Sequence, residues 1–144
     1  MNAERLEIAR RLVACPKWVW LPGMQYMDPD GDVCMPDRVH HVEILRSAWA
    51  IDEPFIFFSD DPADFICARL LVPDLDDDLT RIGVLAVVRL AHGNPLLCTY
   101  PVKMADCEPW WNVGVPWSRE SGGVFCATAR TEVAALADAL EAAR

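Results

Sequence analysis

The sequence predicts one α+β domain, in which an antiparallel sheet carries N-terminal, middle and C-terminal helices packed mainly on one of its faces. The chain has 144 residues, of which 53% are hydrophobic and 24% are charged, as is typical of a folded domain with a sizeable core. Three segments show helical periodicity, and short apolar runs bounded by turn residues lie between them. Because no linker or repeat interrupts this pattern, we expect residues 1–144 to form a single domain.

Capping and helix-breaking residues mark the first and last helices. Asn2 can cap a helix over residues 3–14, and Pro16 prevents its continuation. Thr131 can cap a final helix that extends toward the C-terminus. Apolar residues recur at helical spacing in that segment, at Val133, Leu136, Ala137 and Leu140.

The middle helix has clear start and stop signals. Asp77 or Asp78 can cap a helix over residues 79–92, and Gly93 is well suited to end it. Gly83 would let a neighbouring segment approach closely. The apolar residues lie nearly all round the helix, so we expect them to be largely buried. They are Ile82, Val84, Leu85, Val87, Val88 and Leu90.

The N-terminal half contains several expected strands. Residues 24–27 and 32–35 flank the turn 28–31 (Asp-Pro-Asp-Gly), which is typical of a hairpin. Residues 54–59 form an apolar run that suits a buried strand. Two segments are ambiguous between strand and helix. We prefer extended structure for residues 39–50 and leave both possibilities open for residues 65–72.

The C-terminal half is expected to contain an antiparallel sheet. Residues 96–102, 108–115 and 122–128 are short apolar runs separated by turn residues. Such regular alternation predicts three strands joined by hairpins.

Negative charge gathers in one segment of the chain. The net charge is −9, and residues 51–80 hold nine acidic residues against one basic residue, Arg69. A strongly negative surface repels nucleic acid and attracts basic protein surfaces, so we expect no direct nucleic-acid binding. The segment is either a solubilising, helix-capping region or a docking surface for a basic protein. The acids assigned to this candidate surface are Asp60, Asp61, Asp64, Asp74, Asp76, Asp77 and Asp78.

Tryptophan supplies a second candidate for partner binding. Trp110 and Trp111 are adjacent, and neighbouring residues of a strand point to opposite faces. One of the two rings is therefore expected at an exposed or edge position, where tryptophan often anchors protein interfaces. The alternative is that both rings pack in the core or at its rim.

The sequence contains no recognisable motif for catalysis, cofactor binding or metal binding. It lacks a nucleophile elbow, a P-loop and a dinucleotide fingerprint. The stretch that starts at Asp28 does not match a calcium loop, because Val33 and Val39 occupy the positions that need Gly and Glu. His40 and His41 are adjacent, so their rings should point to opposite faces of a strand and should not share a metal ion. We predict no catalytic residue, metal or cofactor, with an enzyme built from dispersed residues as an alternative.

The chain carries no recognisable targeting or membrane signal. Residues 1–15 lack the apolar core of a signal peptide, and the longest strongly apolar stretch, residues 83–88, is far shorter than the roughly 20 residues of a membrane span. The six cysteines show no paired spacing. We therefore expect a cytoplasmic protein with reduced thiols and no membrane contact.

Two stretches resemble a family of short proteins encoded by phages and prophages. They are ARRLVACPKWVWLPGM (residues 9–24) and VPDLDDDLTRIGVLAVVRLAHGNP (residues 72–95), which together cover 40 of the 144 residues. The second stretch departs from the family late in the helix, where residues 89–92 read Arg-Leu-Ala-His in place of the family's Trp and Glu. The resemblance implies a phage or prophage source and action in a bacterial cytoplasm, and it implies no catalytic residues.

These observations lead to three functional hypotheses. The first is a protein that binds and blocks a host protein with a basic surface, such as an anti-defence inhibitor of the anti-CRISPR type acting on a nucleic-acid-binding protein. The second is an accessory to the structure or assembly of the phage particle. The third is an enzyme of unknown class. Neither the identity of the partner nor the oligomeric state follows from the sequence.

The expected state of the cysteines gives the first testable prediction. All six thiols should be reduced, and none should bind zinc, because no pair has the spacing of a zinc or redox motif. Thiol counting on denatured, unreduced protein is therefore expected to return six. A count of four or fewer would show that disulfides or metal–thiolate bonds are present.

Overall fold

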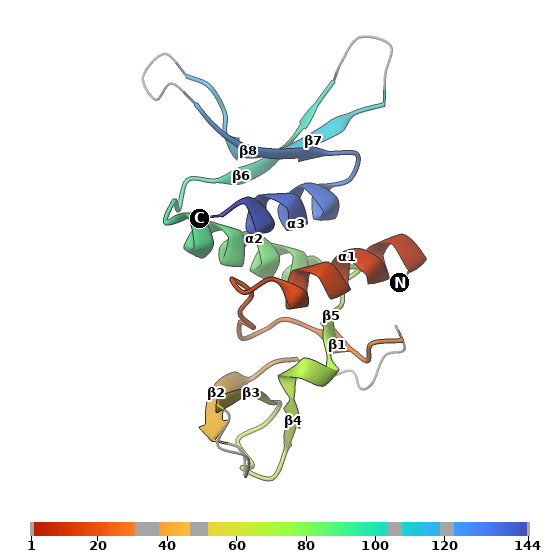
Figure 1. Ribbon diagram of the computed structural model, residues 1–144, viewed down its shortest axis with the longest axis vertical. Coiled ribbons are helices and arrows are strands. Elements are labelled where there is room, and N and C mark those ends of the chain that lie inside the picture. The colour runs from red at the N-terminus through yellow and green to blue at the C-terminus, as the bar shows by residue number, and fades with distance from the viewer. Residues whose placement is uncertain (1, 31–37, 47–51, 104–107, 119–122, 144) are drawn as a thin grey trace. The chain divides into compact units, whose positions relative to one another are not determined.

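The computed structural model contains helices and strands in the mixed arrangement expected from the sequence (Figure 1). Within the part of the chain that it describes, three α-helices accompany three small antiparallel sheets, which confirms the α+β class. The expected single sheet is thus divided into three. The described residues are 2–30, 38–46, 52–103, 108–118 and 123–143.

Internal contacts divide the chain into two compact units. The first unit comprises residues 1–13 and 19–83, and the second comprises residues 14–18 and 84–144. Two compact units can belong to one domain, so the expected single domain stays a prediction. None of the helices in the described ranges is long and apolar enough to cross a membrane.

Helix α1 (Ala3–Ala14) begins and ends where the sequence predicts. The Asn2 side-chain oxygen Oδ1 accepts a hydrogen bond from the backbone N–H of Arg5 at 2.9 Å, as an N-cap does. The residues Ile8, Ala9 and Leu12 recur at helical spacing and are buried. Local capping and periodicity are therefore sufficient to define this helix.

The first unit contains a three-stranded sheet in the order β2-β3-β4. Its strands are β2 (His41–Arg46), β3 (Asp52–Phe57) and β4 (Phe65–Cys67), and all neighbours are antiparallel. The preference for extended structure is confirmed for β2, and residues 47–50 lie outside the described residues. Both alternatives for residues 65–72 occur in part, because β4 continues into a 3-10 turn, η1 (Ala68–Leu70).

A two-stranded sheet joins distant parts of the first unit. Strand β1 (Tyr26–Met27) pairs antiparallel with β5 (Val72–Pro73). Gln25 also forms an antiparallel bridge with Arg38. The expected pairing of residues 24–27 with residues 32–35 cannot be compared directly, since residues 31–37 lie outside the described residues. The partner that the structure gives to Tyr26–Met27 comes from a segment about 45 residues further along the chain, which hairpin logic does not find.

Helix α2 (Asp78–His92) has the predicted start and stop. Asp77 is its N-cap. At the other end, Gly93 has a positive φ of 59°, and its N–H donates to the carbonyl of Leu90 at 3.1 Å. The N–H of Asn94 donates to the carbonyl of Arg89 at 3.0 Å, which completes a Schellman motif.

The expected burial of α2 is only partly correct. Val84, Val87 and Val88 are buried, whereas three large apolar residues are exposed: Leu79, Ile82 and Leu90. Val84 and Val88 project from one side of the helix and Leu79 and Ile82 from the other, whereas Leu90 and Val87, three residues apart, lie at the border between the two sides. The prediction that the apolar side chains of this helix are largely buried was therefore wrong for Ile82 and Leu90. The close approach at Gly83 is confirmed, since a Cβ there would lie 2.6 Å from Cε of Met24.

The second unit contains the sheet that the sequence predicts. Strands β6 (Cys98–Val102), β7 (Trp110–Val115) and β8 (Val124–Ala129) are antiparallel and follow chain order. Helix α3 (Glu132–Ala142) follows directly and lies along one face of this sheet (Figure 1). The Thr131 hydroxyl accepts a hydrogen bond from the N–H of Ala134 at 3.3 Å, which confirms the predicted cap.

A β-bulge lies between β7 and β8. Val113 pairs with Ala127, but the next residue, Gly114, pairs with Phe125, so β8 contains one extra residue at Cys126. A Cβ at Gly114 would collide with the carbonyl oxygen of Val124 and would lie 3.3 Å from Cα of Phe125. Backbone atoms therefore occupy the space that any other residue needs at this position.

Substitutions at two glycines should separate backbone clashes from side-chain clashes. Gly114→Ala is expected to destabilise the protein by about 1–3 kcal/mol, because the bulge would have to open. Gly83→Ala should cost less, since the Met24 side chain can move and alanine favours a helix by up to about 1 kcal/mol. Urea unfolding of both variants measures the difference. Equal stability of Gly114→Ala and wild type would contradict the close backbone approach.

Candidate functional site

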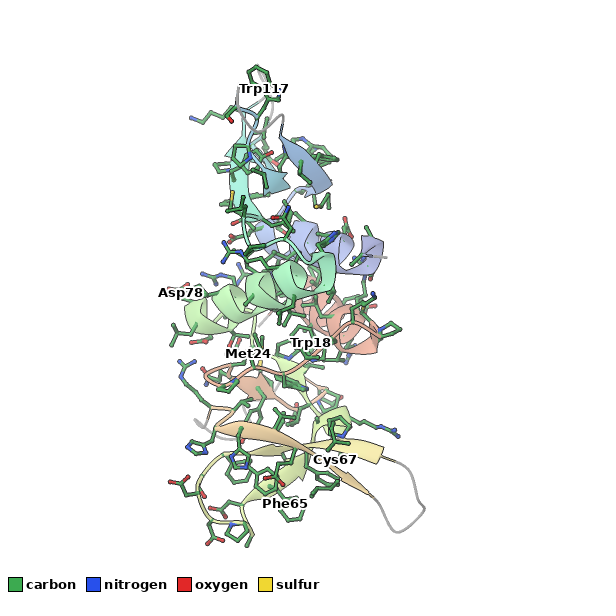
Figure 2. The ribbon with its side chains drawn as sticks, turned by 90° about the vertical axis from the view of Figure 1, so that its left-hand side faces the viewer. Trp18, Met24, Phe65, Cys67, Asp78 and Trp117 are labelled. Atoms are coloured by element: carbon green, nitrogen blue, oxygen red, sulfur yellow. The ribbon has the colours of Figure 1, made fainter. Side chains whose placement is uncertain are left out.

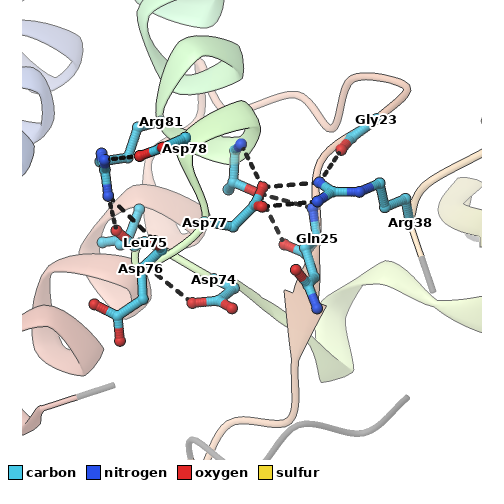
Figure 3. A network of polar contacts seen from close by, with 10 residues as sticks. Gly23, Gln25, Arg38, Asp74, Leu75, Asp76, Asp77, Asp78 and Arg81 are labelled. Atoms are coloured by element: carbon cyan, nitrogen blue, oxygen red, sulfur yellow. Dashed lines mark hydrogen bonds and ion pairs between the residues drawn. The ribbon is translucent and has the colours of Figure 1, made fainter. Parts of the chain in front are cut away.

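The carboxylate of Asp77 is the centre of a polar network in the first unit (Figure 3). Its Oδ2 accepts hydrogen bonds from the backbone N–H and the hydroxyl of Thr80, both at 2.8 Å. Its two oxygens also accept from the guanidinium of Arg38, at 2.7 Å and 2.8 Å. The Asp77 side chain is 14% exposed and that of Arg38 is 39% exposed, so this is a partly covered, bidentate ion pair, and its carboxylate also caps α2.

The same network ties α2 to two other segments. Arg38 donates a third hydrogen bond, to the carbonyl of Gly23 at 2.8 Å. The hydroxyl of Thr80 accepts from the N–H of Gln25 at 2.7 Å. The hydrogen bonds from Arg38 are the main cause that holds the pKa of Asp77 well below its usual range, although burial opposes them. Asp77 therefore stabilises the fold.

The other acids before α2 also bind groups of their own unit. Asp76 forms an ion pair with Arg5 of α1, and Asp78 forms one with Arg81. The side chain of Asp74 accepts a hydrogen bond from the N–H of Asp76 at 2.9 Å. The negative charge of this turn is thus partly compensated within the first unit.

The remaining candidate acids lie in the turn between β3 and β4. We call Asp60, Asp61 and Asp64 the acidic turn, and all three are exposed. Ser59 donates its hydroxyl to Asp64 at 2.8 Å, and Asp61 accepts from the N–H of Ala63 at 2.9 Å. Phe65, next to this turn, is well separated from Asp78 in Figure 2. The seven candidate acids therefore form two groups.

Trp110 and Trp111 lie side by side in β7, and both are half-buried. The guanidinium carbon of Arg130 lies 4.6 Å from the centre of the Trp110 ring, in a cation–π contact. Trp111 is two residues from the buried Val113 and so shares its face of the strand. The two rings therefore point to opposite faces, and neither is among the most exposed apolar side chains.

Among the described residues, the most exposed aromatic side chains instead lie at the end of the β7–β8 hairpin. Trp117 is 73% exposed and Phe125 is 63% exposed, and Val124 beside them is exposed as well. Figure 2 shows Trp117 at this end of the hairpin. Gly123, with a φ of 67°, lies against the backbone of Trp117, because a Cβ at Gly123 would be 3.0 Å from Cα of Trp117. We call Trp117, Val124 and Phe125 the hairpin tip.

Sequence reasoning did not assign these residues to a site. The run from residue 116 to residue 123 contains Pro, Ser and two Gly, which signals a hairpin connection. A tryptophan within such a connection lies beyond the paired strands and is therefore unlikely to be covered by the sheet's own core. That signal was available for Trp117, whereas the exposure of Phe125 depends on the bulge at Cys126.

A hollow of about 400 Å³ lies beside the C-terminal end of α2 in the second unit. Its lining is mostly apolar and consists of Ala86, Arg89, Leu90, Gly93 and Pro95. Arg89 supplies the charged group, and its Nε already donates to the carbonyl of Leu97 at 2.7 Å. These lining residues contain no pair of groups for acid–base chemistry, so the hollow does not favour a catalytic function.

The expected orientation of the paired histidines was wrong. His40 lies just before β2, where strand alternation does not apply, and its Nδ1 lies 3.1 Å from Nδ1 of His41. Four cysteines of the described chain, Cys15, Cys67, Cys98 and Cys126, have free thiols. Among the described residues, no group of three or more His, Cys, Asp or Glu side chains is arranged to hold a metal ion.

The fold and these surfaces define an α+β protein with an exposed aromatic hairpin and a separate acidic turn. No protein-family model matches the chain. Neither a curated protein nor a solved structure is significantly similar to it.

The Asp77 network predicts a pH-dependent stability. Asp77→Ala is expected to lower the free energy of unfolding by about 2–4 kcal/mol, since the helix cap is lost and Arg38 loses its carboxylate. Asp77→Asn should cost less, because the amide oxygen can still cap the helix. Chemical denaturation at several pH values measures both effects.

The sign of the pH effect follows from the lowered pKa of Asp77. The stability from the ionised carboxylate is fully present above the usual Asp pKa and is lost as the pH falls through the lower, folded-state value. The stability difference between wild type and Asp77→Asn should therefore shrink in acid. A difference that stays constant down to the acid unfolding transition would show that the carboxylate charge is unimportant.

Proposed function

We propose that this protein acts by binding another protein, and that the hairpin tip is its main contact. The observation that carries the proposal is the pair of exposed aromatic side chains, Trp117 and Phe125, on one hairpin end. Burying a large apolar side chain yields about 1.5–3 kcal/mol, and tryptophan is enriched among the residues that dominate interface energies.

The charge of the chain favours a basic partner. The net charge is −9, and the acidic turn keeps three exposed carboxylates. Complementary charge mainly accelerates association, whereas buried apolar contacts slow dissociation. A partner with an apolar pocket on a positively charged surface fits both properties.

A positively charged surface of this kind is typical of nucleic-acid-binding proteins, which use it to contact phosphate groups. The resemblance to phage and prophage proteins gives the finer proposal: an anti-defence inhibitor, of the anti-CRISPR type, that acts in the cytoplasm of a bacterial cell. It would occupy a host surface that nucleic acid otherwise uses. A role in assembly of the phage particle uses the same kind of contact with a different partner, and the test below distinguishes the two.

The prediction concerns the hairpin tip. The full chain, immobilised and exposed to bacterial lysate, is expected to retain a basic nucleic-acid-binding protein. With that partner purified, Trp117→Ala and Phe125→Ala should each weaken binding by about tenfold or more, since removing such an anchor typically costs above 1–2 kcal/mol. Titration calorimetry at two salt concentrations measures the affinity and its electrostatic share.

The matched control is Leu96→Ala, which removes another highly exposed apolar side chain of the second unit. It should leave the affinity unchanged. Wild-type affinity in both hairpin-tip variants would refute the proposed contact. If the retained partner is a capsid or tail protein, the protein has a role in assembly and is not an inhibitor. If the partner no longer binds nucleic acid once this protein is bound to it, the role as an inhibitor is supported.

A further inference from the structure

His40 and His41 form a close pair at the start of β2 in the first unit. Their Nδ1 atoms are 3.1 Å apart, and the ring centres are 5.3 Å apart at an interplanar angle of 74°. Both histidines contact Phe57 of β3. The backbone N–H of His40 donates to the Phe57 carbonyl at 2.8 Å, and the His41 ring stacks on the Phe57 ring at 4.6 Å. The two rings are therefore fixed on β3.

Each imidazole has a carboxylate at its far nitrogen. Asp60 Oδ1 lies 3.7 Å from Nε2 of His40, and Glu43 Oε1 lies 3.5 Å from Nε2 of His41. A carboxylate at this position favours a proton on Nε2. With both Nε2 atoms protonated, the lone pairs of the two Nδ1 atoms face each other, and a single cation between them removes the repulsion.

We propose that His40 and His41 bind one divalent transition-metal ion of the zinc class through their two Nδ1 atoms. Asp60 and Glu43 are not ligands. At 3.7 Å and 3.5 Å from the two Nε2 atoms, these carboxylates lie too far away for good hydrogen bonds, and their negative charge stabilises a cation held by the rings.

The separation of the nitrogens fits a shared ion. With metal–nitrogen bonds of about 2.0–2.1 Å, nitrogens 3.1 Å apart subtend about 100° at the metal, between the octahedral and tetrahedral angles. The ion would lie off the line that joins the nitrogens, so the rings must tilt slightly. The side chains are 49% and 40% exposed, which leaves room for this tilt and for entry of the ion.

The ligand set selects the metal. Imidazole nitrogens suit Zn²⁺, Cu²⁺ and Ni²⁺, whereas Ca²⁺ and Mg²⁺ prefer oxygen ligands. Because the described residues add no third protein ligand, water completes the coordination. The site is therefore open at the surface.

The experiment is a Zn²⁺ titration of the full chain, followed by the imidazole nitrogen resonances. The chain has three histidines, and His92, whose Nε2 contacts the Ala139 carbonyl at 2.8 Å, serves as the internal reference. One equivalent of Zn²⁺ should shift Nδ1 of His40 and His41 together and leave His92 unchanged. The proposal is overturned if the His40 and His41 resonances do not move, or if Zn²⁺ affects the cysteines alone.

Variants separate the ligands from the residues that position them. His41→Gln should weaken Zn²⁺ binding at least tenfold and should remove the shift of the His40 resonance. Because the His41 side chain is 40% exposed, its replacement should leave the protein folded. Glu43→Gln should weaken binding about tenfold, the usual effect of losing a carboxylate behind a metal-binding histidine. Glu4→Gln removes the same charge from α1 and is the control. Equal weakening by Glu43→Gln and Glu4→Gln would reduce the effect to net charge and refute the assigned geometry.

Discussion

The contact between Asp77 and Arg38 is the interaction on which the first unit depends. A helix N-terminus leaves backbone N–H groups without partners, and a partly covered guanidinium is stabilised by a carboxylate. Asp77 satisfies both requirements with one side chain. Because Arg38 and Thr80 also bind the backbone at Gly23 and Gln25, the same residues fix the segment that leads into β1. The pairing of β1 with β5 follows from that placement.

In the second unit, the structure depends on the close approach of two backbone segments, β7 and β8. At Gly114 the neighbouring strand lies where a side chain would otherwise be, and the bulge at Cys126 changes the side of β8 from which the preceding residue, Phe125, projects. One face of this sheet is covered by α3. The exposure of Phe125 at the hairpin end is a consequence of this irregular pairing, because a regular ladder would alternate inward and outward residues without interruption.

The surface properties relevant to function are therefore divided. Asp76, Asp77 and Asp78 are engaged by arginines of their own unit, whereas the acidic turn remains available to other molecules. Apolar contact area is offered by the hairpin tip. The histidine pair lies next to the acidic turn in space, through Asp60, so a bound cation would lower the negative charge of that turn. Metal binding and attraction for a basic partner would then oppose each other.

The sequence by itself determined the elements whose causes are local. Caps at Asn2, Asp77 and Thr131 and the Gly93 stop depend on neighbouring backbone groups, so the bounds of α1 and α2 and the start of α3 were predictable within a residue or two. The three strands of the second unit followed from alternating runs and turns in the same way. Tertiary structure alone decided the pairing of β1 with β5, the exposed side of α2, the division of the seven acids and the contact between His40 and His41. Each of these depends on which distant segment lies beside a residue, and a single sequence contains no direct record of such long-range neighbours.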